Sequence, residues 1–139
     1  MSASENFFTK EDLAFLENYL NTYSPTGFEA EGQKVWLEYL KPAIDEYHVD
    51  NYGTVYGVIN PKADFKVVIE AHADEISWYV ANITSDGLLY VRRNGGSDHQ
   101  IAPSMRVWIH TDNGKIPGVF GWPAIHLRKG ANGETPAKV

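Results

Sequence analysis

Hydrophobic positions near the start of the chain recur at the spacing of an amphipathic helix. Leu13, Leu16 and Leu20 follow a Thr-x-x-Asp pattern that opens at Thr9. Such a pattern is typical of a helix start, in which the threonine and the acid satisfy each other's backbone amides. The sequence therefore predicts a helix that begins after Thr9 and ends near Thr22.

A second amphipathic stretch follows a Ser-Pro-Thr-Gly loop. The segment 26–29 (Thr-Gly-Phe-Glu) repeats the capping pattern, and apolar residues then gather between Val35 and Leu40. Pro42 disfavours helical geometry in the residue before it. We therefore expect a helix that is capped by Thr26 and stops at Lys41.

Short β-rich runs come next, and these have the length of strands rather than of helices. They cover residues 46–49, 54–59 and 66–71. The loop 60–64 is short enough to join the last two runs as a hairpin. The first 76 residues thus combine helices and strands.

The pattern of apolar residues changes near Ile76, and no helical spacing follows it. β-Branched and aromatic residues fill four runs that turn-forming Asp, Asn and Gly residues separate: 76–83, 88–92, 105–110 and 115–120. This predicts an α/β part over residues 1–76 and a small all-β part over residues 77–139. Residues 130–139 have almost nothing to bury and are expected to form a loop or a tail.

Composition narrows the class of protein. With 139 residues and 43% hydrophobic content, the chain can build one modest core or two incomplete ones. The net charge of -6 argues against nucleic acid as a partner. No apolar run approaches the roughly 20 residues of a membrane span, and the first residues lack the features of a signal peptide. We therefore expect a soluble, cytoplasmic protein without a membrane or nucleic-acid partner.

One stretch carries candidate metal chemistry. The chain has no cysteine, so His, Asp and Glu are its only strong metal ligands. His72 follows the apolar run 67–71, and Asp74 stands two residues later, on the same face if the strand continues. A carboxylate there can bind one imidazole nitrogen, fix the tautomer and leave the other nitrogen for a metal. His72 is thus a candidate metal ligand, and Asp74 is its candidate orienting acid.

The His-x-Asp pattern is weak by itself because it occurs three times, at residues 48–50, 72–74 and 110–112. The first and third copies run into turn sequences, where the aspartates would bond to nearby backbone. Only His72 follows a run long enough to be a buried strand. A histidine whose hydrogen bonds are all satisfied by the protein remains the alternative for His72. Glu75 would face the opposite side of the strand and is expected to be a structural acid rather than a catalytic base.

Several motifs together resemble a known family, the M42 metallo-aminopeptidases, which include glutamyl aminopeptidase, tetrahedral aminopeptidase and proteins known as cellulase M. The motifs keep the family's order over nearly the whole chain: Ser24-Pro25-Thr26-Gly27-Phe28-Glu29, His72-Ala73-Asp74-Glu75-Ile76, Gly95-Gly96, Gly118-Val119-Phe120-Gly121, Pro123 and His126-Leu127.

The resemblance implies an α/β peptidase domain that is interrupted after the His-x-Asp-Glu motif by a β-barrel used in oligomerisation. It implies two divalent metal ions, zinc or cobalt first among them, of which His72 would bind one while Asp74 orients the imidazole. It also implies peptide substrates and a homo-oligomer. Family members are more than twice as long as this chain, and their remaining ligands and general base lie in the part that follows the inserted domain.

Two hypotheses follow from the sequence. In the first, the chain is the N-terminal portion of a dinuclear-metal aminopeptidase and is inactive alone, because it lacks most metal ligands and the base. In the second, it is a stand-alone, non-catalytic module for oligomerisation or for binding a partner. Whether the chain is itself an enzyme stays open at this stage.

Overall fold

A computed structural model of the chain describes residues 7–98, 100–122 and 124–127. Its contacts divide into two compact units, Met1–Gly95 and Gly96–Val139. These units are defined by contacts within this chain and do not test the domain boundary expected after Ile76. That boundary stays a prediction. The predicted tail at residues 130–139 lies outside the described residues.

The first helix, α1 (Lys10–Asn21), confirms the predicted capping box. The amide of Asp12 donates to Thr9 Oγ1 over 3.1 Å, and the amide of Thr9 donates to Asp12 Oδ2 over 2.7 Å. The other oxygen of Asp12 accepts a hydrogen bond from the hydroxyl of Tyr39 on the second helix. Phe15 and Tyr39 also stack, with ring centroids 3.9 Å apart. An aromatic pair and a shared carboxylate therefore join the two helices.

The second helix, α2 (Ala30–Leu40), ends as predicted and begins differently. Its end passes into a 3-10 turn, η1 (Lys41–Ala43), that contains Pro42. The predicted cap at Thr26 is wrong, because Glu29 occupies the N-cap position and makes no side-chain cap. The carboxylate of Glu29 instead accepts from the amide of Gly27 over 2.6 Å. A long-range bond of the Thr26 hydroxyl, described below, replaces the local cap.

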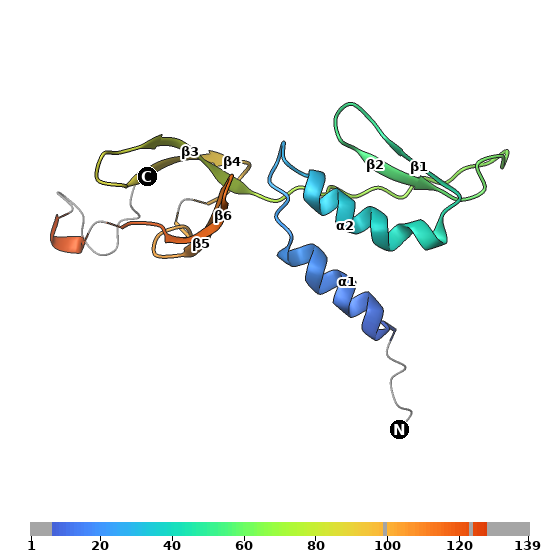
Figure 1. The fold of residues 1–139 in the computed structure, drawn as a ribbon, viewed down its shortest axis with the longest axis horizontal. Helices are drawn as coiled ribbons and strands as arrows, with labels where there is room; N and C mark the ends of the chain where they lie inside the picture. Colours follow the sequence, from blue (N-terminus) through green and yellow to red (C-terminus); the bar gives the residue numbers. More distant parts are fainter. Residues whose placement is uncertain (1–6, 99, 123, 128–139) are drawn as a thin grey trace, which may run out of the picture. The chain divides into compact units, whose positions relative to one another are not determined.

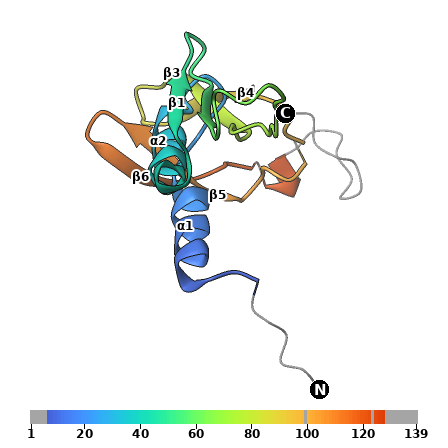
Figure 2. The same cartoon turned by 90° about the vertical axis from the view of Figure 1, so that its right-hand side faces the viewer.

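Strands β1 (Glu46–Val49) and β2 (Val55–Val58) form an antiparallel hairpin that lies beside α2 (Figures 1 and 2). Asp50 closes its turn by accepting from the amides of Tyr52 and Thr54 over 2.8 and 2.9 Å, as the sequence predicts. Gly57 lets the hairpin approach the helix, because a Cβ there would lie 2.8 Å from Leu40 Cδ2.

The predicted strand at 66–71 is absent, and so is its hairpin with 54–59. The segment has no sheet partner and runs as an irregular trace between β2 and β3 (Figure 1). Val67, Val68 and Ile69 are 74%, 82% and 96% exposed. Apolar side chains on both faces are typical of a strand that is buried between neighbours. The described residues of this chain supply no such neighbours, so the pattern exists without the sheet.

The four strands predicted after Ile76 all form. β3 (Ser77–Ile83) pairs with β4 (Leu89–Asn94) in the first unit, and β5 (Arg106–Thr111) pairs with β6 (Gly114–Val119) in the second. A short 3-10 turn, η2 (Ile125–Leu127), follows. Within the described residues each hairpin is a separate two-stranded sheet, so the expected all-β part is present in incomplete form.

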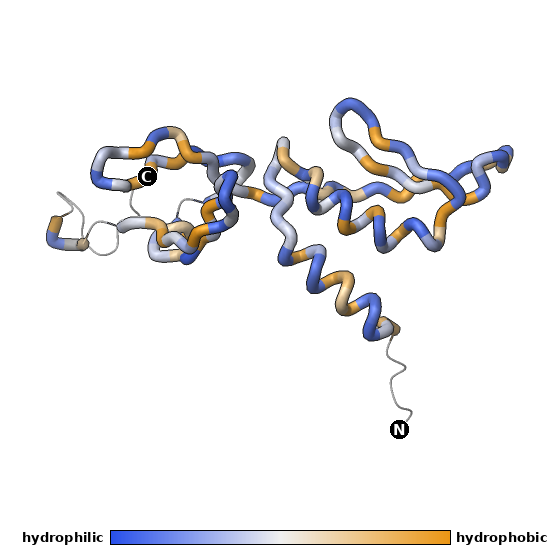
Figure 3. Tube along the Cα trace, viewed as in Figure 1, coloured by the Kyte–Doolittle hydropathy of each residue, from blue (hydrophilic) through white to orange (hydrophobic). Residues whose placement is uncertain are grey.

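The chain has the predicted α/β class, yet it buries little. Hydrophobic positions lie along both helices and along the chain between β2 and β3 (Figure 3). None of the hydrophobic residues that the structure describes is buried, whereas the polar Ser24 and Ser97 are. No helix within the described ranges has the length and apolar character needed to cross a bilayer. Two-stranded hairpins are marginally stable alone, so these elements need further packing partners.

Candidate metal-ligand site

His72 lies just after the unpaired apolar segment, with its side chain 85% exposed. Its Nδ1 is 3.0 Å from the carbonyl oxygen of Asp74 and 3.0 Å from Asp74 Oδ1. A carbonyl and an ionised carboxylate only accept hydrogen bonds, so Nδ1 carries the proton in this geometry. The lone pair then resides on Nε2, which has no bonding partner among the described residues.

Asp74 is held at both carboxylate oxygens. Oδ2 accepts from Thr26 Oγ1 over 2.6 Å, while Oδ1 faces the imidazole of His72. The hydrogen bond from Thr26 is the main cause, and that from His72 the second, of a pKa for Asp74 below its usual value. Asp74 is therefore ionised at neutral pH and can accept from both neighbours.

The loop that carries Thr26 is a turn fixed by glycine. The amide of Phe28 donates to the carbonyl of Pro25 over 2.7 Å, and Gly27 has φ +87°. A positive φ at the third of four residues defines a type II turn, which strongly favours glycine there. The carbonyl of Thr26 also accepts from Asn94 Nδ2 over 2.8 Å, at the end of β4. Two elements thus hold Thr26 in place.

Ser24 joins the same loop to the His-x-Asp-Glu motif. Its amide donates to Glu75 Oε1 over 2.9 Å, and its carbonyl accepts from the amide of Glu75 over 2.8 Å. Its hydroxyl donates to the carbonyl of Ala73 over 2.8 Å. The carboxylate of Glu75 therefore binds a backbone amide, in agreement with the structural role expected for it.

Sequence reasoning missed Ser24 and Thr26 as parts of the site. Thr26 fits a capping pattern. The residues around it give no indication that its hydroxyl bonds to Asp74, which is 48 positions away. The Pro-Thr-Gly-Phe segment does have a type II turn signature, with glycine at its third position. That signature was the available indication that the segment 25–28 is a turn and not the first turn of a helix.

The other two His-x-Asp copies differ from the first. His48 Nε2 lies 3.3 Å from Glu46 Oε1, and Asp50 is used by its turn. In the third copy the turn bonds come from Thr111 rather than from Asp112. Thr111 Oγ1 donates to the carbonyl of Gly114 over 2.7 Å and accepts from the amide of Asn113 over 3.2 Å. The His48 imidazole therefore lies beside Glu46 rather than Asp50, and the turn of the third copy is closed without Asp112.

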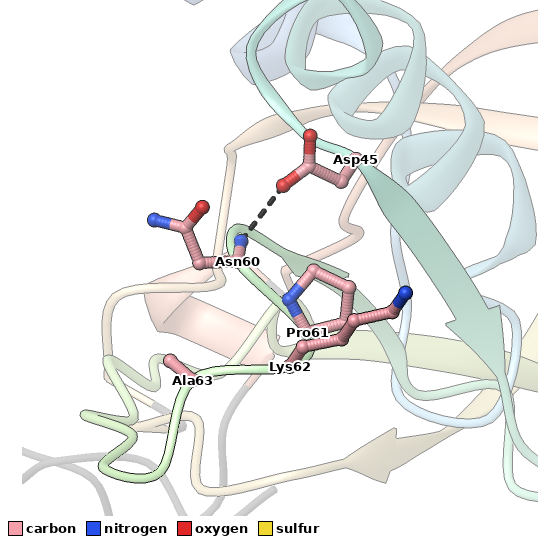
Figure 4. Close-up of a pocket in the computed structure, with 5 residues that line it drawn as sticks. All are labelled: Asp45, Asn60, Pro61, Lys62 and Ala63. Atoms are coloured by element: carbon pink, nitrogen blue, oxygen red, sulfur yellow. Dashed lines mark hydrogen bonds between the residues drawn. The ribbon is translucent and has the colours of Figure 1, made fainter.

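The residues present fit one ligand of a metal site and not a complete site. No group of three His, Asp or Glu side chains with metal-binding geometry occurs within the described residues, whereas a catalytic zinc takes three protein ligands. A shallow hollow elsewhere in the first unit contains none of the motif residues (Figure 4). Its lining is made by Asp45, Asn60, Pro61, Lys62 and Ala63.

Comparisons with known proteins identify the class of protein to which this fold and this oriented histidine belong. The family model described as M42 glutamyl aminopeptidase matches residues 53–139. The chain belongs to this family. The predicted resemblance is thereby confirmed.

Relatives and solved structures show how much of a family member the chain represents. It is 29% identical over 112 residues to a protein of Acetivibrio thermocellus named as an aminopeptidase, covering 80% of this chain and 33% of that protein. The TET aminopeptidase of the marine archaeon Thaumarchaeota archaeon SCGC AB-539-E09 is 25% identical, with a TM-score of 0.80 over 85% of this chain and 33% of its own.

A third comparison extends the likeness of the fold. The Pyrococcus horikoshii TET1 peptidase, described as able to assemble into a tetrahedron or a large octahedral shell, is 23% identical, with a TM-score of 0.72 over 91% of this chain and 37% of that chain. The chain therefore spans about a third of the length of the proteins it matches, in line with the N-terminal portion that the family resemblance implies.

Proposed function

We propose that this chain carries the N-terminal part of a dinuclear-metal aminopeptidase. His72 is a ligand of one of the two divalent ions, and Asp74 orients its imidazole. The observation that carries the proposal is the pair of 3.0 Å contacts from Nδ1 of His72 to Asp74, which leave Nε2 as the lone-pair nitrogen. Metal-binding histidines commonly donate their other ring N–H to a carboxylate or a carbonyl in this way.

The complete centre needs groups that the described residues do not bring together. A bound metal ion supplies an activated water for attack on a peptide bond. Zinc or cobalt is the proposed ion, since imidazole and carboxylate ligands suit both. The further ligands and the general base come from polypeptide beyond this portion of the family's length. The proposed substrates are peptides with a free N-terminus, the proposed assembly is a homo-oligomer, and the proposed location is the cytoplasm.

The test is a zinc titration of the full chain followed by NMR of the histidine side chains. We expect the ring signals of His72 to shift or broaden first, and binding to be weak because one imidazole replaces several ligands. His72→Ala should abolish this effect. Asp74→Asn should weaken the binding by about 10–100-fold, as is typical when an orienting partner of a ligand is lost.

His48→Ala is the matched control, because His48 belongs to the same sequence pattern and has a different partner. It should leave the response of His72 unchanged. Zinc binding that survives His72→Ala at wild-type strength contradicts the assignment, and His110 and His126 would then be the histidines to substitute.

A second candidate function is a non-catalytic module for oligomerisation or for binding a partner chain. The exposed apolar residues of the segment 66–71 favour it, since such a surface binds other polypeptide. Metal binding distinguishes the two candidates. A module of this kind has no reason to require His72, whereas the peptidase portion does.

A further inference from the structure

Thr26 lies at the end of a chain of contacts that leads to the candidate metal ligand. Its hydroxyl donates to Asp74 Oδ2 over 2.6 Å, and the other carboxylate oxygen lies 3.0 Å from Nδ1 of His72. A carboxylate that is bound at one oxygen only can rotate about its side-chain bonds. A second bond at the other oxygen, from an independently held donor, restricts that rotation and fixes the direction in which Oδ1 points.

The donor is independently held. The backbone of Thr26 sits in the type II turn that Gly27 permits, and its carbonyl accepts from Asn94 Nδ2 over 2.8 Å. Asn94 ends β4, which is 68 residues away in sequence. Neither of these contacts involves Asp74. Thr26 can therefore act as a fixed point for the carboxylate and does not merely follow it.

The hydroxyl of Thr26 has no local duty that explains its position. α2 begins at Ala30 with Glu29 as its N-cap, so Thr26 does not cap the helix. The distance of 2.6 Å is in the range of strong O–H to carboxylate bonds. Its place at the second position of the turn aims the side chain at the segment that follows His72.

We propose that Thr26 is a positioning residue: through Asp74 it holds His72 as the Nδ1–H tautomer, with Nε2 available to a metal ion. The metal-binding half of this statement rests on the proposed function, whereas the tautomer half does not. In water the neutral side chain of histidine favours Nε2–H. Loss of the Thr26 hydroxyl should therefore move His72 toward the tautomer that places its proton where the metal would bind.

The test is nitrogen NMR of the His72 ring in the full chain without metal, at a pH where the imidazole is neutral. Thr26→Val removes the hydroxyl while keeping the shape of the side chain, and we expect it to shift the ring toward Nε2–H. Thr26→Ser restores the hydroxyl and should return the wild-type spectrum. Thr22→Val is the matched control, since its hydroxyl donates to Asn18 O over 2.8 Å and has no contact with Asp74.

The amide spectrum of each variant checks that the fold is retained. Should Thr26→Val lose that spectrum, Asn94→Ala provides a second route, because it releases the backbone of Thr26 and leaves the hydroxyl in place. It should shift the tautomer in the same direction. A wild-type tautomer in the folded Thr26→Val or Asn94→Ala variant overturns the proposal. An equal shift in Thr22→Val also overturns it, since the effect would then be general to the unit.

Zinc titration of the same variants separates this inference from the proposed function. Thr26→Val should weaken binding by roughly 3- to 10-fold, less than the about 10–100-fold typical of losing a ligand's direct partner, and Thr26→Ser should restore it. If the tautomer shifts and His72→Ala still binds zinc like the wild type, the metal assignment fails and the positioning role stands. If His72→Ala abolishes zinc binding and the tautomer ignores Thr26, the proposed function stands and the positioning role fails.

Discussion

Ser24 and Gly32 show how single residues bring α2 to the candidate site. Ser24 is 6% exposed and bonds to Ala73 and Glu75 through its side chain and backbone. Gly32, in the first turn of α2, lies against it: a Cβ there would be 2.9 Å from Ser24 Oγ and 3.1 Å from its Cβ. The absence of a side chain at Gly32 therefore lets the helix pack on the loop that holds the motif.

Gly32→Ala should loosen this contact without a large change in global stability. The added methyl group displaces Ser24 Oγ from the carbonyl of Ala73, at a cost of about 0.5–1.5 kcal/mol for a hydrogen bond. Alanine regains about 0.8–1.0 kcal/mol in helix propensity, so the two effects nearly cancel. The sensitive measurement is local: hydrogen exchange of the Glu75 amide, which donates to Ser24 O, should accelerate about fivefold for each 1 kcal/mol lost.

Glu31→Ala is the control for this experiment, because Glu31 lies on the same turn of α2 and, within the described residues, pairs only with the exposed Lys34. Surface pairs of this kind contribute little. It should leave the exchange of the Glu75 amide at the wild-type rate. Unchanged exchange in Gly32→Ala would mean that α2 does not press on Ser24.

At the scale of elements, α1 depends on one carboxylate for both its cap and its partner helix. Asp12 accepts from the amide of Thr9 and from the hydroxyl of Tyr39. The bond from Tyr39 is the first cause, and that from Thr9 the second, of a pKa for Asp12 below its usual value. The folded state thus favours the ionised form of this carboxylate.

The helical pair α1–α2 should weaken in acid for this reason. A depressed folded-state pKa gives stability that is present above the unfolded pKa of an aspartate and is lost as the pH falls through the lowered value. Circular dichroism at 222 nm should therefore fall below about pH 4, near the ordinary aspartate pKa. Asp12→Asn should remove this step in the titration. A titration that Asp12→Asn leaves unchanged would assign the acid loss to other carboxylates.

The segment 66–71 is apolar and exposed and has no strand partner in the described part of the chain. Its Val67, Val68 and Ile69 are largely exposed, and its backbone pairs with no strand in the described part of the chain. Unpaired strand edges and exposed apolar patches recruit other polypeptides. This is the physical basis for expecting the chain to associate.

We predict self-association or poor solubility of the chain at tens of micromolar. Light scattering should report species above the monomer mass, and Ile69→Lys should reduce them because a charge interrupts the apolar run. Ile59→Lys is the matched control: it makes the same change at a residue that is 63% exposed and lies outside the segment. A sharp monomer with cooperative unfolding would contradict the prediction and favour a self-sufficient module.

At the scale of the whole molecule, the chain represents about a third of the family members it matches and buries none of its described hydrophobic side chains. The backbone nevertheless follows the solved TET aminopeptidase, with a TM-score of 0.80. The chain thus keeps much of the backbone path of that structure, although none of its described hydrophobic side chains is buried.

We predict that the chain alone has no aminopeptidase activity. One oriented imidazole cannot replace three metal ligands and a general base within reach of the attacking water. The assay is release of chromophore from aminoacyl anilides with added zinc, cobalt or manganese. Turnover above the free-metal background that His72→Ala abolishes would show that the chain completes an active site.

Much of the secondary structure followed from local pattern because its causes are local. The capping box at Thr9, the helix stop before Pro42 and the turn at Asp50 each depend on bonds or clashes within four residues. The strands after Ile76 formed for a similar reason, since hairpins pair neighbours in sequence. The contact between His72 and Asp74 could be predicted because it spans only two residues, whereas their role at a metal ion stays a prediction.

The tertiary structure alone decided what depends on distant partners. Thr26 reads as a helix cap, and it bonds to Asp74 because the folded chain brings a carboxylate within 2.6 Å of its hydroxyl. The segment 66–71 reads as a strand, but a strand exists only where another strand satisfies its backbone, and none lies beside it in the described residues. The sequence by itself determined which groups can interact. Long-range geometry determined which of them do, because a hydrogen bond forms only where folding places donor and acceptor together.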